Sequence, residues 1–158
     1  MDQSKRQAML EQYKRGYQEV AEAIAGATEA ELDARPAPGK WTAREIVHHL
    51  ADSETNSAIR LRKLLTEPYP VVQAYDQALY AVLLRYNTRD HADALEMFRT
   101  ARTTTHQLLT VMTDEDWTRA GWHAEHGLYT ATVWLQIYAV HAHNHAAQIR
   151  RLREALDR

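Results

Sequence analysis

Glycine and proline are scarce in this chain, and they lie between long stretches that carry helical periodicity. Only five Gly and four Pro occur among 158 residues, and no alternating pattern typical of a strand extends over a useful length. The periodicity predicts four long amphipathic helices, over residues 4–25, 42–66, 90–112 and 130–156. Four such helices indicate an all-α four-helix bundle, formed by a single domain over residues 1–158.

Local start and stop signals define the ends of these helices and predict shorter ones in the connections. The first long helix stops near Gly26, a capping box in TARE at residues 42–45 opens the second, and Pro68 ends it. Short helical elements are expected at residues 28–31, 76–85 and 113–117. Residues 119–129 are predicted to form a loop, with a small hairpin as the alternative. Because the connections on both sides of the third helix are long, a simple up-down-up-down order is disfavoured.

The charge and composition of the chain argue against several classes of protein. Lys and Arg total 19 against 21 Asp and Glu, a formal charge of −2, whereas a nucleic-acid-binding domain carries a basic excess. The chain has no cysteine, so any metal must be held by His, Asp or Glu. The N-terminus MDQSKRQAMLEQ lacks the apolar segment of a signal peptide, and no apolar run approaches the roughly 18 residues of a membrane helix. We therefore expect a cytoplasmic protein that binds neither nucleic acid nor membrane.

Two histidines in the last long helix are candidate metal ligands. His141 and His145 are four residues apart, so they lie about 40° apart on one helical face and can present two nitrogen atoms to one ion. Trp134 and Tyr138 fall on the same face, which indicates a partly aromatic, inward-looking stripe. His143 points to the opposite side and is expected to be solvated.

The second long helix carries two adjacent histidines, and its apolar stripe distinguishes them. That stripe is defined by Ile46, Leu50, Leu61 and Leu64. His49 lies at the edge of the stripe, on the side of Asn56 and Arg60, whereas His48 lies nearly opposite and is expected to face solvent. His49 is therefore the candidate third ligand. On spacing alone, an ordinary boundary histidine with no ligand role remains the alternative.

Other metal motifs fit this chain poorly. The zincin motif places Glu directly after the first His, where this chain has Ala142. Carboxylate-bridged di-iron bundles need two Glu-x-x-His motifs, and EIVH at residues 45–48 has no usable second copy. His123 and His126 could flank the mouth of a site, but exposed loop histidines are the favoured interpretation.

Three segments together resemble a known family. GKWTAREIVHHLADSE at residues 39–54 resembles the first motif of the DinB-like superfamily, especially its YfiT-like branch. NSAIRLRKLLTEP at residues 56–68 is also similar to that branch, and HAHNHAAQI at residues 141–149 resembles its second motif. The resemblance extends from about residue 39 to the C-terminus, with both motifs in the expected order and separation.

The resemblance implies a fold and a metal site. The fold is a four-helix bundle in the order up-down-down-up, with short extra helices in the connections, often as a homodimer. The metal is one divalent ion per chain, held by the residues that match the family's ligands: His49, His141 and His145. Zinc is the first candidate, with nickel, iron, cobalt or manganese as alternatives, since three imidazoles suit several of these ions.

The resemblance also implies a function. It predicts a metal-dependent enzyme acting on a small molecule, either a hydrolase or a transferase that uses a low-molecular-weight thiol. Because the chain has no thiol of its own, a transferred sulfur must come from a cosubstrate. The alternative is a non-enzymatic, metal-stabilised dimeric stress or binding protein.

Several further residues are candidates for the site, although no catalytic base stands out. Glu45 and Asp52 flank His49 and could orient its ring, or could be ordinary exposed acids. Arg60 could receive an anionic substrate group, with a surface ion pair as the alternative. The remaining candidates for substrate contact share the helical faces of the expected ligands: Asn56, Trp134 and Tyr138.

Overall fold

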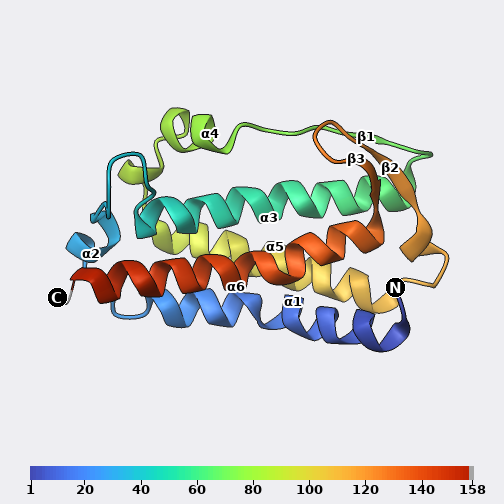
Figure 1. Cartoon of the computed structure of the whole chain (residues 1–158), viewed down its shortest axis with the longest axis horizontal. Coiled ribbons are helices and arrows are strands. Elements are labelled where there is room, and N and C mark those ends of the chain that lie inside the picture. Colours follow the sequence, from blue (N-terminus) through green and yellow to red (C-terminus); the bar gives the residue numbers. More distant parts are fainter. Residues whose placement is uncertain (157–158) are drawn as a thin grey trace.

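Four long helices form the body of the molecule. The computed structural model describes residues 1–156 of the chain. The long helices are α1 (Gln3–Ile24), α3 (Ala43–Thr66), α5 (His91–Val111) and α6 (Ala131–Leu156). They lie side by side along the long axis of the molecule (Figure 1), and their bounds are close to the predicted ranges. The four-helix bundle expected from the sequence is confirmed.

The helices follow the order up-down-down-up. In Figure 1, α1 and α6 run from the end where the hairpin lies to the opposite end, and α3 and α5 both run back. The chain must therefore return along the outside of the bundle between the end of α3 and the start of α5. Because this return is long, α3 and α5 can run parallel to each other rather than antiparallel.

The return segment, residues 67–90, contains three short elements. The three are β1 (Val71–Val72), α4 (Gln77–Leu83) and the 3₁₀ helix η1 (Tyr86–Thr88). A further short helix, α2 (Glu29–Asp33), precedes α3. The predicted capping box at the start of α3 is present, and a second capping box opens α2. The short helix predicted at residues 76–85 is confirmed as α4, with Asp76 accepting a hydrogen bond from the backbone of Leu79.

A hairpin precedes α6, so the loop prediction for residues 119–129 was wrong and its alternative is confirmed. The 3₁₀ helix η2 (Asp116–Thr118) leads into β2 (Ala120–His123) and β3 (Gly127–Thr130), and β1 pairs in parallel with β2. Gly121 permits this close pairing, because a Cβ atom there would lie 2.4 Å from the carbonyl oxygen of Pro70. The parallel pairing ties the hairpin to the return segment.

Two apolar clusters make up the core, with a polar layer between them along the bundle axis. One cluster includes Val20, Ile46, Leu50, Phe98 and Ile149. The other includes Leu10, Leu61, Leu109, Trp134 and Leu135. Glu54 and Arg102, which lie between the two clusters on α3 and α5, are 1% and 2% exposed. Within residues 1–156, none of the helices combines the length and apolar character needed to cross a membrane.

Candidate metal centre

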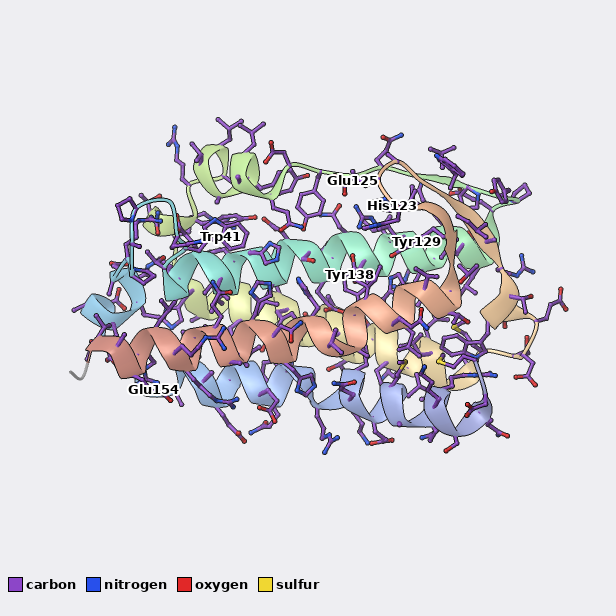
Figure 2. All side chains as sticks on the ribbon, in the orientation of Figure 1. Trp41, His123, Glu125, Tyr129, Tyr138 and Glu154 are labelled. Atoms are coloured by element: carbon purple, nitrogen blue, oxygen red, sulfur yellow. The ribbon has the colours of Figure 1, made fainter. Side chains whose placement is uncertain are left out.

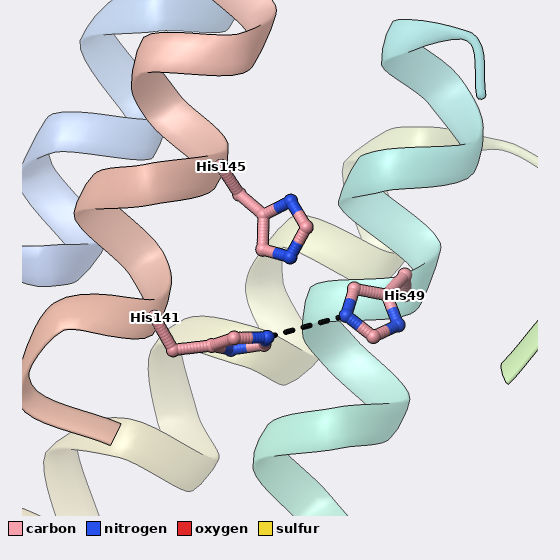
Figure 3. Close-up of side chains that lie close together, drawn as sticks. All are labelled: His49, His141 and His145. Carbon is pink, nitrogen blue, oxygen red and sulfur yellow. Dashed lines mark hydrogen bonds between the residues drawn. The ribbon is translucent and has the colours of Figure 1, made fainter. Parts of the chain in front are cut away.

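Helices α3 and α6 bring three imidazole rings together at the middle of the bundle. His49 projects from α3, and His141 and His145 project from successive turns of α6 (Figure 3). The Nε2 atoms of His49 and His141 lie 3.3 Å apart. Each of the three rings offers one nitrogen atom, and these atoms all lie within 4.8 Å of one another. The expected face of α6 and the expected edge of α3 therefore meet.

The spacing of these nitrogen atoms suits a bound metal ion. Two nitrogen ligands at about 2.0–2.1 Å from a tetrahedral ion are separated by about 3.3 Å, which matches the distance from His49 to His141. The third ring is held in a suitable orientation, since Nδ1 of His145 lies 3.0 Å from the side-chain oxygen of Gln148. A proton on Nδ1 that is donated to this oxygen leaves the lone pair of Nε2 available to an ion.

Burial keeps the three rings neutral. It lowers the pKa of His49 to about 3, and the neighbouring His145 adds to this effect. Burial also lowers the pKa of His141 well below its ordinary value, and lowers that of His145. Neutral imidazoles have the unprotonated nitrogen that a metal ligand requires. The indole of Trp41 packs against His49, with ring centroids 4.7 Å apart, and helps to bury it.

His48 is buried, so the prediction that it faces solvent was wrong. It is 2% exposed, its Nε2 lies 3.3 Å from the carbonyl oxygen of Arg89, and its ring stacks on Tyr86. The periodicity of α3 correctly placed His48 and His49 on different sides of the helix. It could not show that the return segment and the start of α5 cover the side of His48.

His143 also differs from its prediction. It is partly buried rather than solvated, and its Nε2 lies 2.8 Å from the carbonyl oxygen of Gln12 on α1. The side of α6 opposite the three-histidine group packs against α1, so it is not open to solvent. His143 nevertheless stays apart from the three-histidine group.

The two carboxylates expected near His49 bind other partners. Glu45 is buried and accepts hydrogen bonds from the backbone of Thr42 and the side chains of Arg35 and Asn87. Asp52 accepts a hydrogen bond from the hydroxyl of Tyr86. Neither carboxylate is hydrogen-bonded to His49 within the described structure. Glu45 acts as a helix cap, and Asp52 lies with His48 on the other side of α3.

A cavity of about 130 Å³ adjoins the three-histidine group, and His141 forms part of its wall. Two of the expected substrate-contact residues, Arg60 and Tyr138, line it. Trp134 does not, because it is fully buried in the core and donates its indole N–H to the carbonyl oxygen of Ser57. Asn56 is also absent from the lining and donates its side-chain amide to the carbonyl oxygen of Asp52.

The hairpin contributes residues to this cavity, including His123 and His126, for which flanking a site was the less favoured interpretation. His123, Glu125 and Tyr129 lie where the hairpin covers α3, close to Tyr138 of α6 (Figure 2). His123 is 1% exposed, so its expected exposure was wrong. The sequence signal that could have shown this burial is the alternation of side chains along a strand, which places Gly121 and His123 on one face and Trp122 on the other. In the structure Gly121 and His123 are buried, whereas Trp122 is half exposed.

Comparison with known proteins identifies the family and agrees with this fold. The family model described as DinB superfamily matches residues 12–149. The chain is 33% identical over 132 residues to a Bacillus subtilis protein named "Putative metal-dependent hydrolase YfiT", covering 83% of this chain and 74% of the relative. A relative from Oceanobacillus iheyensis with the same kind of name is 34% identical over 127 residues, covering 80% of this chain and 73% of the relative.

Solved structures also show the similarity of the fold. The structure of YfiT from Bacillus subtilis, described as having an unusual four-helix bundle topology, superposes with a TM-score of 0.92 at 28% identity. That match covers 99% of this chain and 90% of the other. A mycothiol-dependent maleylpyruvate isomerase shares the fold alone, with a TM-score of 0.74, 12% identity, and coverage of 91% of this chain and 60% of the other. The chain therefore belongs to the DinB superfamily, in its YfiT-like branch.

Proposed function

We propose that this protein is a divalent-metal-dependent enzyme that acts on a small molecule, with His49, His141 and His145 as the metal ligands. The observation that carries the proposal is the 3.3 Å separation of the Nε2 atoms of His49 and His141, which matches two ligands of one tetrahedral ion. The names of the relatives support metal dependence and favour hydrolysis as the reaction. Zinc is the first candidate for the ion.

The ligand set supports a catalytic rather than a structural site. No fourth His, Asp or Glu from residues 1–156 joins the three histidines, so a bound ion keeps an open coordination position. When bound, the ion supplies Lewis-acid activation of an oxygen or sulfur donor in that position. The cavity beside His141 provides room for a substrate. A purely structural, metal-stabilised protein requires neither the open position nor the cavity.

Transfer of a low-molecular-weight thiol is the second candidate reaction. Three neutral imidazoles leave the charge of the ion uncompensated, which favours an anionic ligand such as a thiolate. The chain has no cysteine, so the sulfur must come from a small-molecule cosubstrate. The dimer implied by the family resemblance stays a prediction, which sedimentation analysis of the metal-loaded protein can check.

The reaction can be tested with cobalt-substituted protein. For a thiol transferase, adding a low-molecular-weight thiol should produce an intense near-ultraviolet charge-transfer band that persists below the free thiol pKa of about 8.5. For a hydrolase, the protein should cleave ester or amide substrates without such a band. His145→Ala should abolish either result and His143→Ala should preserve it. A metal-loaded protein that neither binds thiols nor cleaves any substrate would favour the structural alternative.

A further inference from the structure

The cavity beside the three-histidine group contains an arginine with no acidic partner. Arg60 is partly buried and donates hydrogen bonds to the hydroxyl of Tyr138 at 3.2 Å and to the carbonyl oxygen of Gln73 at 2.6 Å. Among residues 1–156, no carboxylate lies within ion-pair distance of its guanidinium, so the surface ion pair considered as an alternative is not formed there. These two hydrogen bonds leave three of its five N–H donors unused. A partly buried positive charge with spare donors favours an anionic ligand.

Unpartnered polar atoms surround this arginine. Within the described part of the chain, the buried Nε2 of His123 and the buried hydroxyl groups of Tyr75 and Tyr129 have no hydrogen-bond partner, and all three residues line the same cavity. Buried polar groups are normally satisfied, so three such atoms around one cavity indicate a missing ligand or solvent. The guanidinium of Arg60 also lies over the ring of Tyr75, 5.7 Å from its centroid.

These atoms are hydrogen-bond donors at neutral pH. The backbone N–H of Glu125 donates to Nδ1 of His123 over 3.1 Å, so the proton of the neutral ring is on Nε2. Burial lowers the pKa of His123, which keeps the ring neutral. Burial raises the pKa of Tyr75 to about 12 and also raises that of Tyr129, so both hydroxyl groups keep their protons.

Among the described residues that line the cavity, one unpaired positive charge, that of Arg60, is available to an anionic ligand. Arg60 is the only Lys or Arg in the lining, and Glu125 is the only Asp or Glu. Glu125 is exposed on the hairpin and makes no ion pair with Arg60. One guanidinium surrounded by neutral donors suits a carboxylate, whereas a phosphate monoester carries close to two negative charges at pH 7.

We propose that the cavity is a carboxylate-binding subsite, in which Arg60, His123 and Tyr129 hold an anionic end of the substrate beside the metal centre. This inference rests on the proposed function, since it names the substrate class of the same site. The shared wall residue His141 places the subsite next to the three-histidine group. The cavity of about 130 Å³ is close to the roughly 150 Å³ that holds one benzene ring. The subsite therefore has room for a carboxylate group with about one ring attached.

Titration of the protein with benzoate and its neutral analogue benzamide tests this proposal. Benzoate should bind to both zinc-loaded and metal-free protein, with a selective change in the NMR signals of the His123 ring, and benzamide should bind much more weakly. Arg60→Gln should weaken benzoate binding by about tenfold or more, because it removes a charge-assisted hydrogen bond. Glu125→Gln should tighten binding slightly, because it removes a nearby negative charge. Arg62→Gln should have no effect, since Arg62 lies on the same helix outside the cavity.

The outcomes separate this inference from the proposed function. Arg60-dependent binding in a protein that takes up no metal would support the subsite and overturn the metal-dependent function. Benzoate binding that needs zinc but is unaffected by Arg60→Gln would place the carboxylate on the metal and overturn the subsite. Equal affinity for benzoate and benzamide, or tighter binding of inorganic phosphate than of benzoate, would also overturn it.

Discussion

Two buried polar clusters in this bundle differ in how completely their atoms are satisfied. In the first, Arg102 donates to the Glu54 carboxylate at 2.6 Å and to the carbonyl oxygens of Tyr13 and Tyr138 at 2.7 and 3.0 Å, while the Tyr13 hydroxyl donates to Glu54. In the second, the ring nitrogen atoms of the three histidines lie within 4.8 Å of one another, and no partner for Nδ1 of His141 is found among residues 1–156. The first cluster is closed by its own hydrogen bonds, and the second remains open.

The difference separates a structural network from a candidate site. A buried charge is tolerated when a partner and further hydrogen bonds compensate it, as at Arg102 and Glu54. Imidazole rings gathered with their nitrogen atoms facing one another could hold one metal ion together. Position in the bundle does not distinguish these clusters, because both lie between α3 and its neighbours. The availability of their polar atoms does.

The largest effect is expected in the closed cluster. Arg102→Met should lower the free energy of unfolding by about 3–5 kcal/mol, because it leaves the Glu54 carboxylate buried without its partner. Urea unfolding of the metal-free protein measures this change. Arg99→Met is the matched control on the same helix, since Arg99 makes only an exposed pair with Glu96, and it should leave the free energy of unfolding almost unchanged. A loss below 1 kcal/mol for Arg102→Met would mean that the network is not essential to the fold.

In the open cluster, truncation should remove the metal rather than the fold. The wild-type protein should bind about one divalent ion per chain, and His49→Ala, His141→Ala or His145→Ala should each weaken binding by about 100-fold or more. Elemental analysis and metal titration measure this. His48→Ala and His143→Ala are controls, because their rings bond backbone carbonyl groups away from the cluster. Equal metal content in wild type and His145→Ala would refute the ligand assignment.

Acid should destabilise the metal-free protein through the open cluster. The folded protein keeps His49 neutral down to a pKa of about 3, whereas the unfolded chain takes up a proton near pH 6.5. Since the unfolded state then binds more protons, the free energy of unfolding should fall as the pH drops from about 6.5 toward 3. The slope is about 1.4 kcal/mol per pH unit for this one residue. Urea unfolding from pH 7 to 5 should show a shallower slope in His49→Leu, and an unchanged slope would contradict the buried neutral state.

The smallest effect is expected at Gln148, whose side chain contacts the ring of His145. Gln148→Ala removes the oxygen that lies 3.0 Å from Nδ1 of His145 and should weaken metal binding by about tenfold. Competition with a chelator of known affinity measures the change. Gln136→Ala on the exposed side of the same helix should leave the affinity unchanged. Full affinity in Gln148→Ala would show that packing alone orients His145.

Local sequence signals were sufficient for the helices and for much of the three-histidine group. Capping boxes and proline stops predicted the ends of α3, and the four-residue spacing placed His141 and His145 on one face. The periodicity of α3 separated His49 from His48. These predictions hold because they depend on the geometry of single helices. The order of the helices and the pairing of His49 with α6 came from the resemblance to a family, not from periodicity.

Contacts between distant segments were decided only by the tertiary structure. The Arg102–Glu54 pair joins residues 48 positions apart, and no pattern within one helix predicts that they meet. His48 is buried by the return segment, and the periodicity of a helix does not predict the path of that segment. His123 reaches the cavity because its hairpin pairs with the two-residue strand β1. Periodicity describes which side of one element a residue occupies. What covers that side, and which polar atoms remain unpaired there, depends on how the elements assemble.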